Sequence, residues 1–303
     1  MATKNLGKDL QICRDSGSWA SPAHIPLIGA RNIKIANKPS AMINSTDRVS
    51  ASTIITPTEI PTRRSLSVSF DIMWGAGAGV VALRTAFLAG TAIRLAVVNK
   101  HPTASSAASG VGYRGDWLVK KFPVKMPLAD GQMVDIELVP HGNYTNAVSE
   151  YTDATTSLGT PETQATKKLG KGGSVNDSTN APITAVRDFS FSAEWETAKA
   201  HDRGCEFDLE VPTMRKVSAE LEFMWEEANT QLTAFRTAWE ANSPITLSLL
   251  DGAYATAGSW GPKADWAISD HPIDANLNDG QLCKVKLMPH GNYSTAFTFL
   301  TTS

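Results

Sequence analysis

An internal repeat is the strongest constraint on the fold of this chain. The segment 130–144, DGQMVDIELVPHGNY, returns at 279–293 as DGQLCKVKLMPHGNY, with nine of fifteen positions identical at an offset of 149. A second pair matches at an offset of 151: IPTRRSLSVSFDIMW at 60–74 and VPTMRKVSAELEFMW at 211–225. Because related segments follow in the same order, the sequence predicts two copies of one structural unit.

The repeat predicts two domains of similar size. We place the first copy at 1–150 and the second at 181–303. The segment 151–180 is dense in Thr, Gly, Ser and Lys and has almost no large apolar residue, so we predict that it is a linker. A chain of 303 residues with 42% hydrophobic residues can bury two ordinary cores.

Strands are predicted at equivalent places in both copies. Apolar and polar residues alternate at 65–72 and at 217–223, which is typical of a strand with one buried face. The last strand of each copy follows an Asp-Gly turn and shows the same alternation. Its predicted core positions are Val134, Ile136 and Leu138 in the first copy, and Cys283, Val285 and Leu287 in the second.

One helix is predicted in each copy, at 77–89 and at 226–241, from apolar residues at the i, i+3, i+7 spacing. Gly90 ends the first helix, and Asn242-Ser243-Pro244 ends the second. A single helix among mostly antiparallel strands predicts a mainly β fold. We therefore expect two tandem homologous β-sandwich or barrel domains, each with one flanking α-helix.

Composition excludes several classes of protein. The net charge of −2 gives no general argument for nucleic-acid or membrane binding. The three cysteines, Cys13, Cys205 and Cys283, are odd in number and not equivalent between copies, which argues against a disulfide framework or a zinc site and suits a reducing cytoplasm. No export signal or transmembrane run is present, so we expect a protein without a membrane partner.

The repeated Pro-His-Gly-Asn-Tyr, at 140–144 and 289–293, is the main candidate for chemistry. A single histidine per copy without a second ligand is a weak metal site or general base. We predict a turn in which Pro ends the strand, Gly permits a positive φ, and His or Asn forms a capping hydrogen bond. The duplicated Asp-Trp pairs at 116–117 and 265–266 are expected to be a turn or solvated carboxylate beside a core tryptophan.

The order of these segments resembles the tail tube protein, or major tail protein, of long-tailed bacteriophages. The resemblance is carried by the strands that end in Trp74 and Trp225, the Ala-x-Arg-Thr-Ala helices, the Trp117 and Trp266 strands, and the final Asp-Gly-Gln strands. It covers both copies and rests on order and duplication rather than on one motif. It implies a β-sandwich or barrel with one helix, whose protomers join sheets into rings that stack as a tube conducting DNA.

The resemblance also implies partners and a location. Two fused domains depart from the commonest pattern of one domain per hexameric ring, and imply a homotrimer with pseudo-six-fold symmetry. The protein would be a structural virion component of a siphovirus-like tail, assembled in the bacterial cytoplasm. Its partners would be tape measure, tail terminator, and distal tail or baseplate proteins, with transient passage of DNA. No catalytic residue, cofactor or metal is implied, and we expect no enzyme.

Matched positions on the last strands carry opposite charges. The first copy has Asp135 and Glu137 where the second has Lys284 and Lys286. These charges would let a first-copy domain pair with a second-copy domain, although neutral drift on a solvated face explains them equally. The longer segments 36–59 and 192–210 are candidates for contacts between stacked rings.

Two other classes of function stay open from the sequence. A tandem β-sandwich binding module, such as an adhesin or a carbohydrate binder, would use Trp19 and Trp260 as exposed aromatics and would remain a monomer. An enzyme would use His141 and His290, and would lose turnover when either histidine is replaced.

Overall fold

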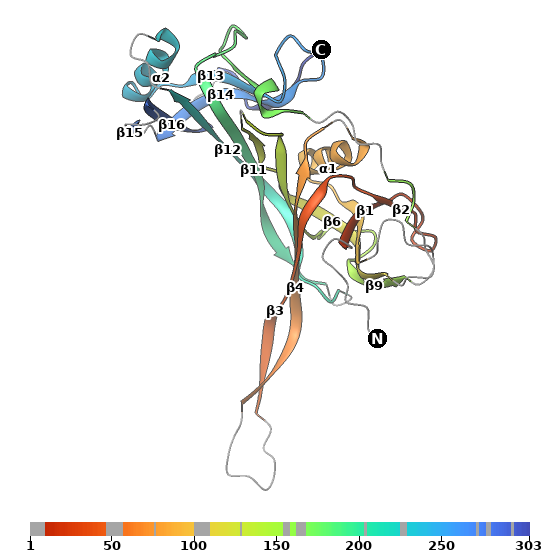
Figure 1. The fold of residues 1–303 in the computed structure, drawn as a ribbon. Helices are drawn as coiled ribbons and strands as arrows, with labels where there is room; N and C mark the ends of the chain where they lie inside the picture. Colours follow the sequence, from red (N-terminus) through yellow and green to blue (C-terminus); the bar gives the residue numbers. More distant parts are fainter. Residues whose placement is uncertain are drawn as a thin grey trace.

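The computed structural model describes residues 10–46, 57–75, 77–99, 110–127, 129–153, 158–161, 168–202, 205–224, 229–270, 273–276, 280–291 and 294–303. These residues form one sheet of 17 strands, with antiparallel ladders, and two α-helices (Figure 1). The predicted mainly β fold is confirmed. No helix of the described residues combines the length and the apolar character that a membrane crossing needs.

The first half of the described chain, residues 10–153, contains nine strands and one helix. Their bounds are β1 Leu10–Asp15, β2 His24–Pro26, β3 Ala30–Thr46, β4 Pro57–Met73, α1 Ala78–Ala89, β5 Ile93–Asn99, β6 Gly110–Lys121, β7 Val124–Met126, β8 Met133–Pro140 and β9 Ser149–Asp153.

The second half, residues 168–303, contains eight strands and one α-helix after a short 3-10 helix. Their bounds are η2 Gly170–Gly172, β10 Ser174–Asn176, β11 Val186–Ala200, β12 Leu209–Met224, α2 Thr230–Glu240, β13 Ile245–Leu250, β14 Trp260–Asp270, β15 Ile273–Asn276, β16 Gly280–Pro289 and β17 Thr298–Thr301. The predicted linker, 151–180, thus includes the end of β9 and all of β10.

The ladders follow the same order in both halves. In the first half the order is β1, β5, β6, β8, β4, β3, and in the second it is β10, β13, β14, β16, β12, β11. A register shift also occurs at the same place, before Lys121 on β6 and before Asp270 on β14. Equivalent residues, at offsets of 149 to 152, therefore occupy equivalent ladder positions.

The strand and helix predictions hold for the described residues. Every predicted core position on β8 and β16 is fully buried, because alternate side chains of a strand point to one face. Helix α1 ends at Gly90, whose φ of 61° is left-handed. Helix α2 begins after Asn229, whose side chain accepts hydrogen bonds from the N–H groups of Gln231 and Leu232. The predicted helical residues 226–228 lie outside the described residues.

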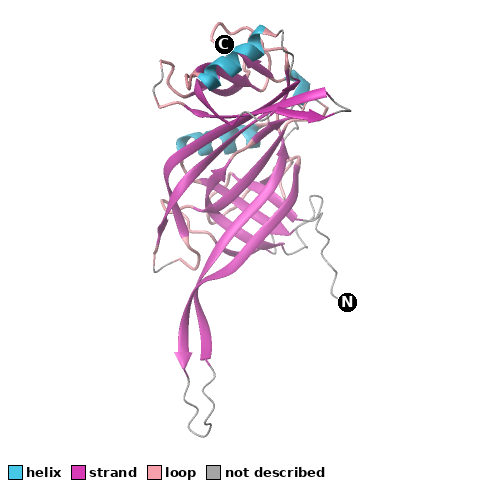
Figure 2. Cartoon of the chain, turned by 90° about the vertical axis from the view of Figure 1, so that its left-hand side faces the viewer, coloured by secondary structure: helices cyan, strands magenta, loops and turns pink. Residues whose placement is uncertain are grey.

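Two long hairpins differ in what they touch. The hairpin of β3 and β4 projects away from the rest of the described chain (Figure 1 and Figure 2), whereas the hairpin of β11 and β12 lies along the first half. The predicted segments 36–59 and 192–210 fall largely in these hairpins, although residues 47–56 and 203–204 lie outside the described part.

Candidate assembly interface

The two halves are joined by a short ladder between β7 and β11, which we call the core of the internal junction. Val124, Lys125 and Met126 of β7 pair with Phe191, Ser190 and Phe189 of β11. The Phe122 N–H extends the ladder by donating a hydrogen bond of 2.9 Å to the Ala193 carbonyl. This ladder makes the sheets of the two halves continuous.

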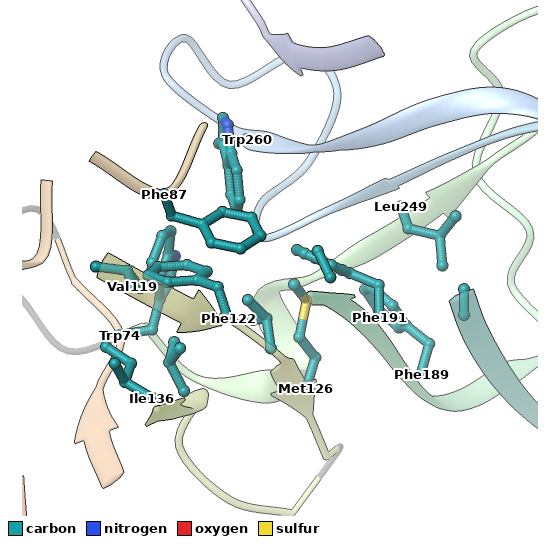
Figure 3. Packing of buried hydrophobic residues seen from close by; sticks show 14 of the residues in the cluster. Trp74, Phe87, Val119, Phe122, Met126, Ile136, Phe189, Phe191, Leu249 and Trp260 are labelled. Carbon is teal, nitrogen blue, oxygen red and sulfur yellow. The ribbon is translucent and has the colours of Figure 1, made fainter. Parts of the chain in front are cut away.

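Aromatic side chains fill the internal junction from both halves. Trp74 and Phe122 of the first half contact Trp260 of the second, with ring centroids 5.4 and 6.3 Å from its ring, and Phe191 lies 5.7 Å from Trp260 (Figure 3). The Trp74 Nε1–H donates to Asp251 Oδ2 across the junction. Trp260 is buried, so the hypothesis that it is an exposed platform for a ligand is wrong.

The hairpin of β11 and β12 also covers the end of helix α1. Trp195 donates its Nε1–H to the Phe87 carbonyl at 2.8 Å, and the Arg215 guanidinium lies 5.5 Å from the Trp195 ring centroid. A Cβ atom at Gly90 would lie 3.1 Å from Trp195. Phe87 is therefore fully buried, partly by residues that come from the other half of the chain.

The Pro-His-Gly-Asn-Tyr turn of the first half is part of the internal junction. The Gly142 N–H donates to the Glu210 carbonyl at 2.8 Å. Gly142 does not have the positive φ that we predicted. Its small size matters instead, because an added Cβ would lie 2.3 Å from Val211 Cγ2.

His141 holds the same turn. Its Nδ1 accepts a hydrogen bond of 2.8 Å from the Asn143 N–H, so its Nε2 carries the proton and donates to the Gly90 carbonyl at 3.2 Å. The predicted capping role is confirmed. Both ring nitrogens are used by the fold, which gives no support to His141 as a general base.

An ion cluster crosses the internal junction. Lys121 Nζ lies 3.2 Å from Glu137 Oε2 in its own half and 3.9 Å from Glu194 Oε2 in the other. The charge of Glu137 and the hydrogen bond to it raise the pKa of Lys121 above its ordinary value; Glu194 and Asp135 add to this, and burial opposes it. Lys120 adds a second ion pair, at 2.8 Å to Glu210.

The structure places all four predicted charged residues on one pair of equivalent strands. Asp135 and Glu137 lie on β8, and Lys284 and Lys286 lie on β16. The two lysines contact acids of their own half, at 3.4 Å for Lys284 with Glu222 and 3.6 Å for Lys286 with Asp270. One chain does not bring the acidic pair against the lysine pair, and their pairing between domains stays a prediction.

The sequence comparison missed the charges next to these four. Lys121 is equivalent to Asp270, and Glu194 is equivalent to Lys38. The same comparison of the two copies would have found them, since both positions reverse in sign.

Each end of the long sheet leaves one edge open. Among the described residues β3 forms a ladder only with β4, and β15 only with β16. In the repeat β3 is equivalent to β11, and β15 is equivalent to β7. The two open edges are thus the counterparts of the two strands that meet inside the chain.

Apolar residues are exposed beside the open edge of the second half. Trp239 of α2 is 44% exposed, whereas its equivalent Phe87 is fully buried. Met288 of β16 is 50% exposed, whereas its equivalent Val139, on a strand that contacts β12, is 3% exposed. The difference marks the surface that the β11 and β12 hairpin covers in the first half.

The described residues offer little to a metal or to catalysis. No three His, Cys, Asp or Glu side chains gather among them as a metal ion would need. All three cysteines are free. The internal junction and the open edges are the features that set this chain apart.

No protein-family model matches this sequence, and no curated protein matches it. Two solved structures share part of its fold at low similarity. One is from the virion of a native gene transfer agent particle, with 14% identity and a TM-score of 0.35 over 44% of this chain and 98% of the other. The second is from the tail of an empty gene transfer agent particle with C6 symmetry, with 15% identity and a TM-score of 0.34 over 42% of this chain and 97% of the other.

Proposed function

We propose that this chain is a structural virion protein that polymerises into stacked rings and forms the tube of a phage tail, the conduit for DNA ejection. It acts as two domains, 1–150 and 181–303, connected by the linker 151–180. One observation carries the proposal: the strands that meet in the internal junction have counterparts, β3 and β15, whose edges are open at the two ends of the sheet.

Complementary edges at two ends of one chain give a head-to-tail contact. Such a contact forms a closed ring when its rotation closes, and an open filament when it does not. If the contact between chains resembles the internal junction, domains of the two types alternate around the ring. Three chains of two domains then fill the six places that the resemblance to tail tube proteins implies.

The projecting β3 and β4 hairpin supports the stacking of rings. It extends beyond the rest of the described chain (Figure 2), so it can reach a neighbouring ring along the tube axis. Partners at the ends of the tube would be the tape measure, tail terminator and distal tail or baseplate proteins. The net charge of −2 suits a tube through which DNA passes without sticking.

Negative-stain electron microscopy of the purified protein, over a concentration series and with mass measurement on the same samples, tests this function. We expect rings or tubes whose mass is a multiple of three chains. A particle that stays monomeric at every concentration, including in the presence of excluded-volume agents, contradicts the proposal. It would favour the binding module instead.

A further inference from the structure

The internal junction contains three alternating charges. Lys121 of β6 stands between Glu137 of β8, at 3.2 Å, and Glu194 of β11, at 3.9 Å. The first two belong to the first half and the third to the second half. The order acid, lysine, acid therefore runs across the boundary between the halves.

The second half carries the same arrangement with the signs reversed. Asp270 follows the β14 register shift as Lys121 follows that of β6, and it pairs with Lys286 as Lys121 pairs with Glu137. Asp270 Oδ2 lies 3.6 Å from Lys286 Nζ. The side where Glu194 would stand is the open side of the second half.

The third member has its counterpart at the other end of the chain. Glu194 of β11 pairs with Lys216, and Lys38 of β3 pairs with Ser65, the residue equivalent to Lys216. Lys38 is exposed and lies on the strand whose outer edge is open. It has the sign that Asp270 requires.

We propose that successive chains join by repeating the internal junction with reversed charges, so that β15 of one chain pairs with β3 of the next and Lys38 of the next chain faces Asp270. The partner is a second copy of this chain, and the inference rests on the proposed function. The exposed Trp239 and Met288 lie on the same side and become buried under the incoming hairpin, as Phe87 and Val139 are in the first half.

The reversal makes the two kinds of junction incompatible with each other. A β3 hairpin in the place of β11 would bring Lys38 against Lys121, and a β11 hairpin in the place of β3 would bring Glu194 against Asp270. Because like charges at close range oppose association, only alternating domain order is favoured. The charge pattern thus specifies which edge each hairpin binds.

The charge prediction is tested by measuring the protein concentration at which half the chains are assembled, by light scattering and microscopy. We expect Lys38→Glu or Asp270→Lys to raise this concentration about tenfold, since each replaces an attraction by a repulsion. The triple variant Lys38→Glu, Asp270→Lys, Lys286→Glu copies the signs of the internal junction and should return to within about threefold of the natural protein. Single variants that assemble normally overturn the charge pairing.

Glu194→Lys is the matched control. It makes the same kind of change inside one chain, so it should lower the urea midpoint of unfolding and leave the assembly concentration within about twofold. If it raises the assembly concentration as much as Lys38→Glu does, the effect is a general one of charge and the proposal is wrong.

The register is tested by a disulfide between chains. The internal pair Lys125 and Ser190 corresponds to positions 274 and 34. The variant Lys34→Cys, Asp274→Cys should form covalent multimers under mild oxidation, because directly opposed residues have Cα atoms within disulfide range. The off-register variant Lys34→Cys, Asn276→Cys and the chain with native cysteines alone should stay as single chains on a denaturing gel.

The outcomes separate this junction from the function itself. Rings or tubes that form without the 34–274 disulfide, and that ignore Lys38→Glu, overturn the junction and leave the tube function standing. A chain that shows neither particles nor disulfide-linked multimers overturns both.

Discussion

Two buried aspartates show how single residues hold the repeated fold. Asp116 accepts hydrogen bonds of 2.8 Å from the N–H groups of Thr145 and Asn146, and Asp265 accepts bonds of 2.6 and 2.8 Å from those of Ser294 and Thr295. The tryptophan that follows each aspartate is fully buried. The predictions of a turn hydrogen bond and of core tryptophans are confirmed.

Replacement of Asp265 should make stability depend less on acid. Burial alone would raise the pKa of Asp265, but hydrogen bonds from Thr246, Thr295 and Ser294 bring it down to about 2. A carboxyl lowered in this way stabilises the fold above its unfolded pKa of about 3.9, and this contribution is lost as the pH falls towards 2. Asp265→Ala should therefore lose about 1–3 kcal/mol at pH 6, because two turn N–H groups lose their acceptor.

Urea unfolding at several pH values checks this prediction. The difference in unfolding free energy between the natural protein and Asp265→Ala should shrink between pH 4 and pH 2. Asp265→Asn keeps an acceptor oxygen and serves as the control for shape. A difference that stays constant over this range would show that the carboxylate charge contributes nothing.

The two repeated glycines of the Pro-His-Gly-Asn-Tyr turns should respond differently to alanine. Gly142→Ala places a Cβ 2.3 Å from Val211 Cγ2 and should destabilise the chain by about 1–3 kcal/mol. Gly291 has no atom within 4 Å of an added Cβ, so Gly291→Ala should leave the urea midpoint unchanged. If the junction between chains repeats the internal one, Gly291→Ala should weaken assembly instead, as measured by light scattering.

At the scale of elements, the two helices occupy equivalent places with different cover. Phe87 of α1 lies under the β11 and β12 hairpin, whereas Trp239 of α2 is 44% exposed. Phe87→Ala should cost about 3–5 kcal/mol of unfolding free energy. Trp239→Ala should cost little in the single chain and should raise the concentration for half assembly about tenfold. A Trp239 variant that unfolds as easily as the Phe87 variant, yet assembles normally, contradicts this assignment.

The elements that sequence predicted best are those with strong local signals. The period-two alternation of β4, β8, β12 and β16 fixed their buried faces, and Gly90 marked the end of α1. The fold of the PHGNY turn was harder to predict, since the need for glycine at position 142 comes from Val211, which is far away in sequence. The β7 and β11 ladder could not be predicted either, because three residues of β7 carry no periodic pattern.

At the scale of the whole molecule, the contacts between halves should outlast the peptide connection. The β7 and β11 ladder, the Trp74 and Trp260 pair and the Lys121 and Glu194 ion pair all cross from one half to the other. A protease site placed within residues 162–167 should be cut without separating the fragments. We expect them to elute together from a sizing column at micromolar concentration and to separate only in urea.

A second cut tests whether the junction is responsible. The variant Trp74→Ala combined with Glu194→Lys removes two contacts of the junction, and its cut fragments should separate at lower urea than those of the natural sequence. If the natural fragments separate at once in buffer, the halves are held by the linker alone.

The internal junction also changes the statistics of assembly. Each association of free bodies loses translational and rotational entropy, at a cost estimated at about 4–15 kcal/mol. A junction that is built into the chain escapes this loss, so only every second contact around a closed ring requires a collision between molecules. Ring formation from fused pairs therefore has a lower kinetic order than ring formation from single domains, and it can begin from a more dilute pool of newly made protein.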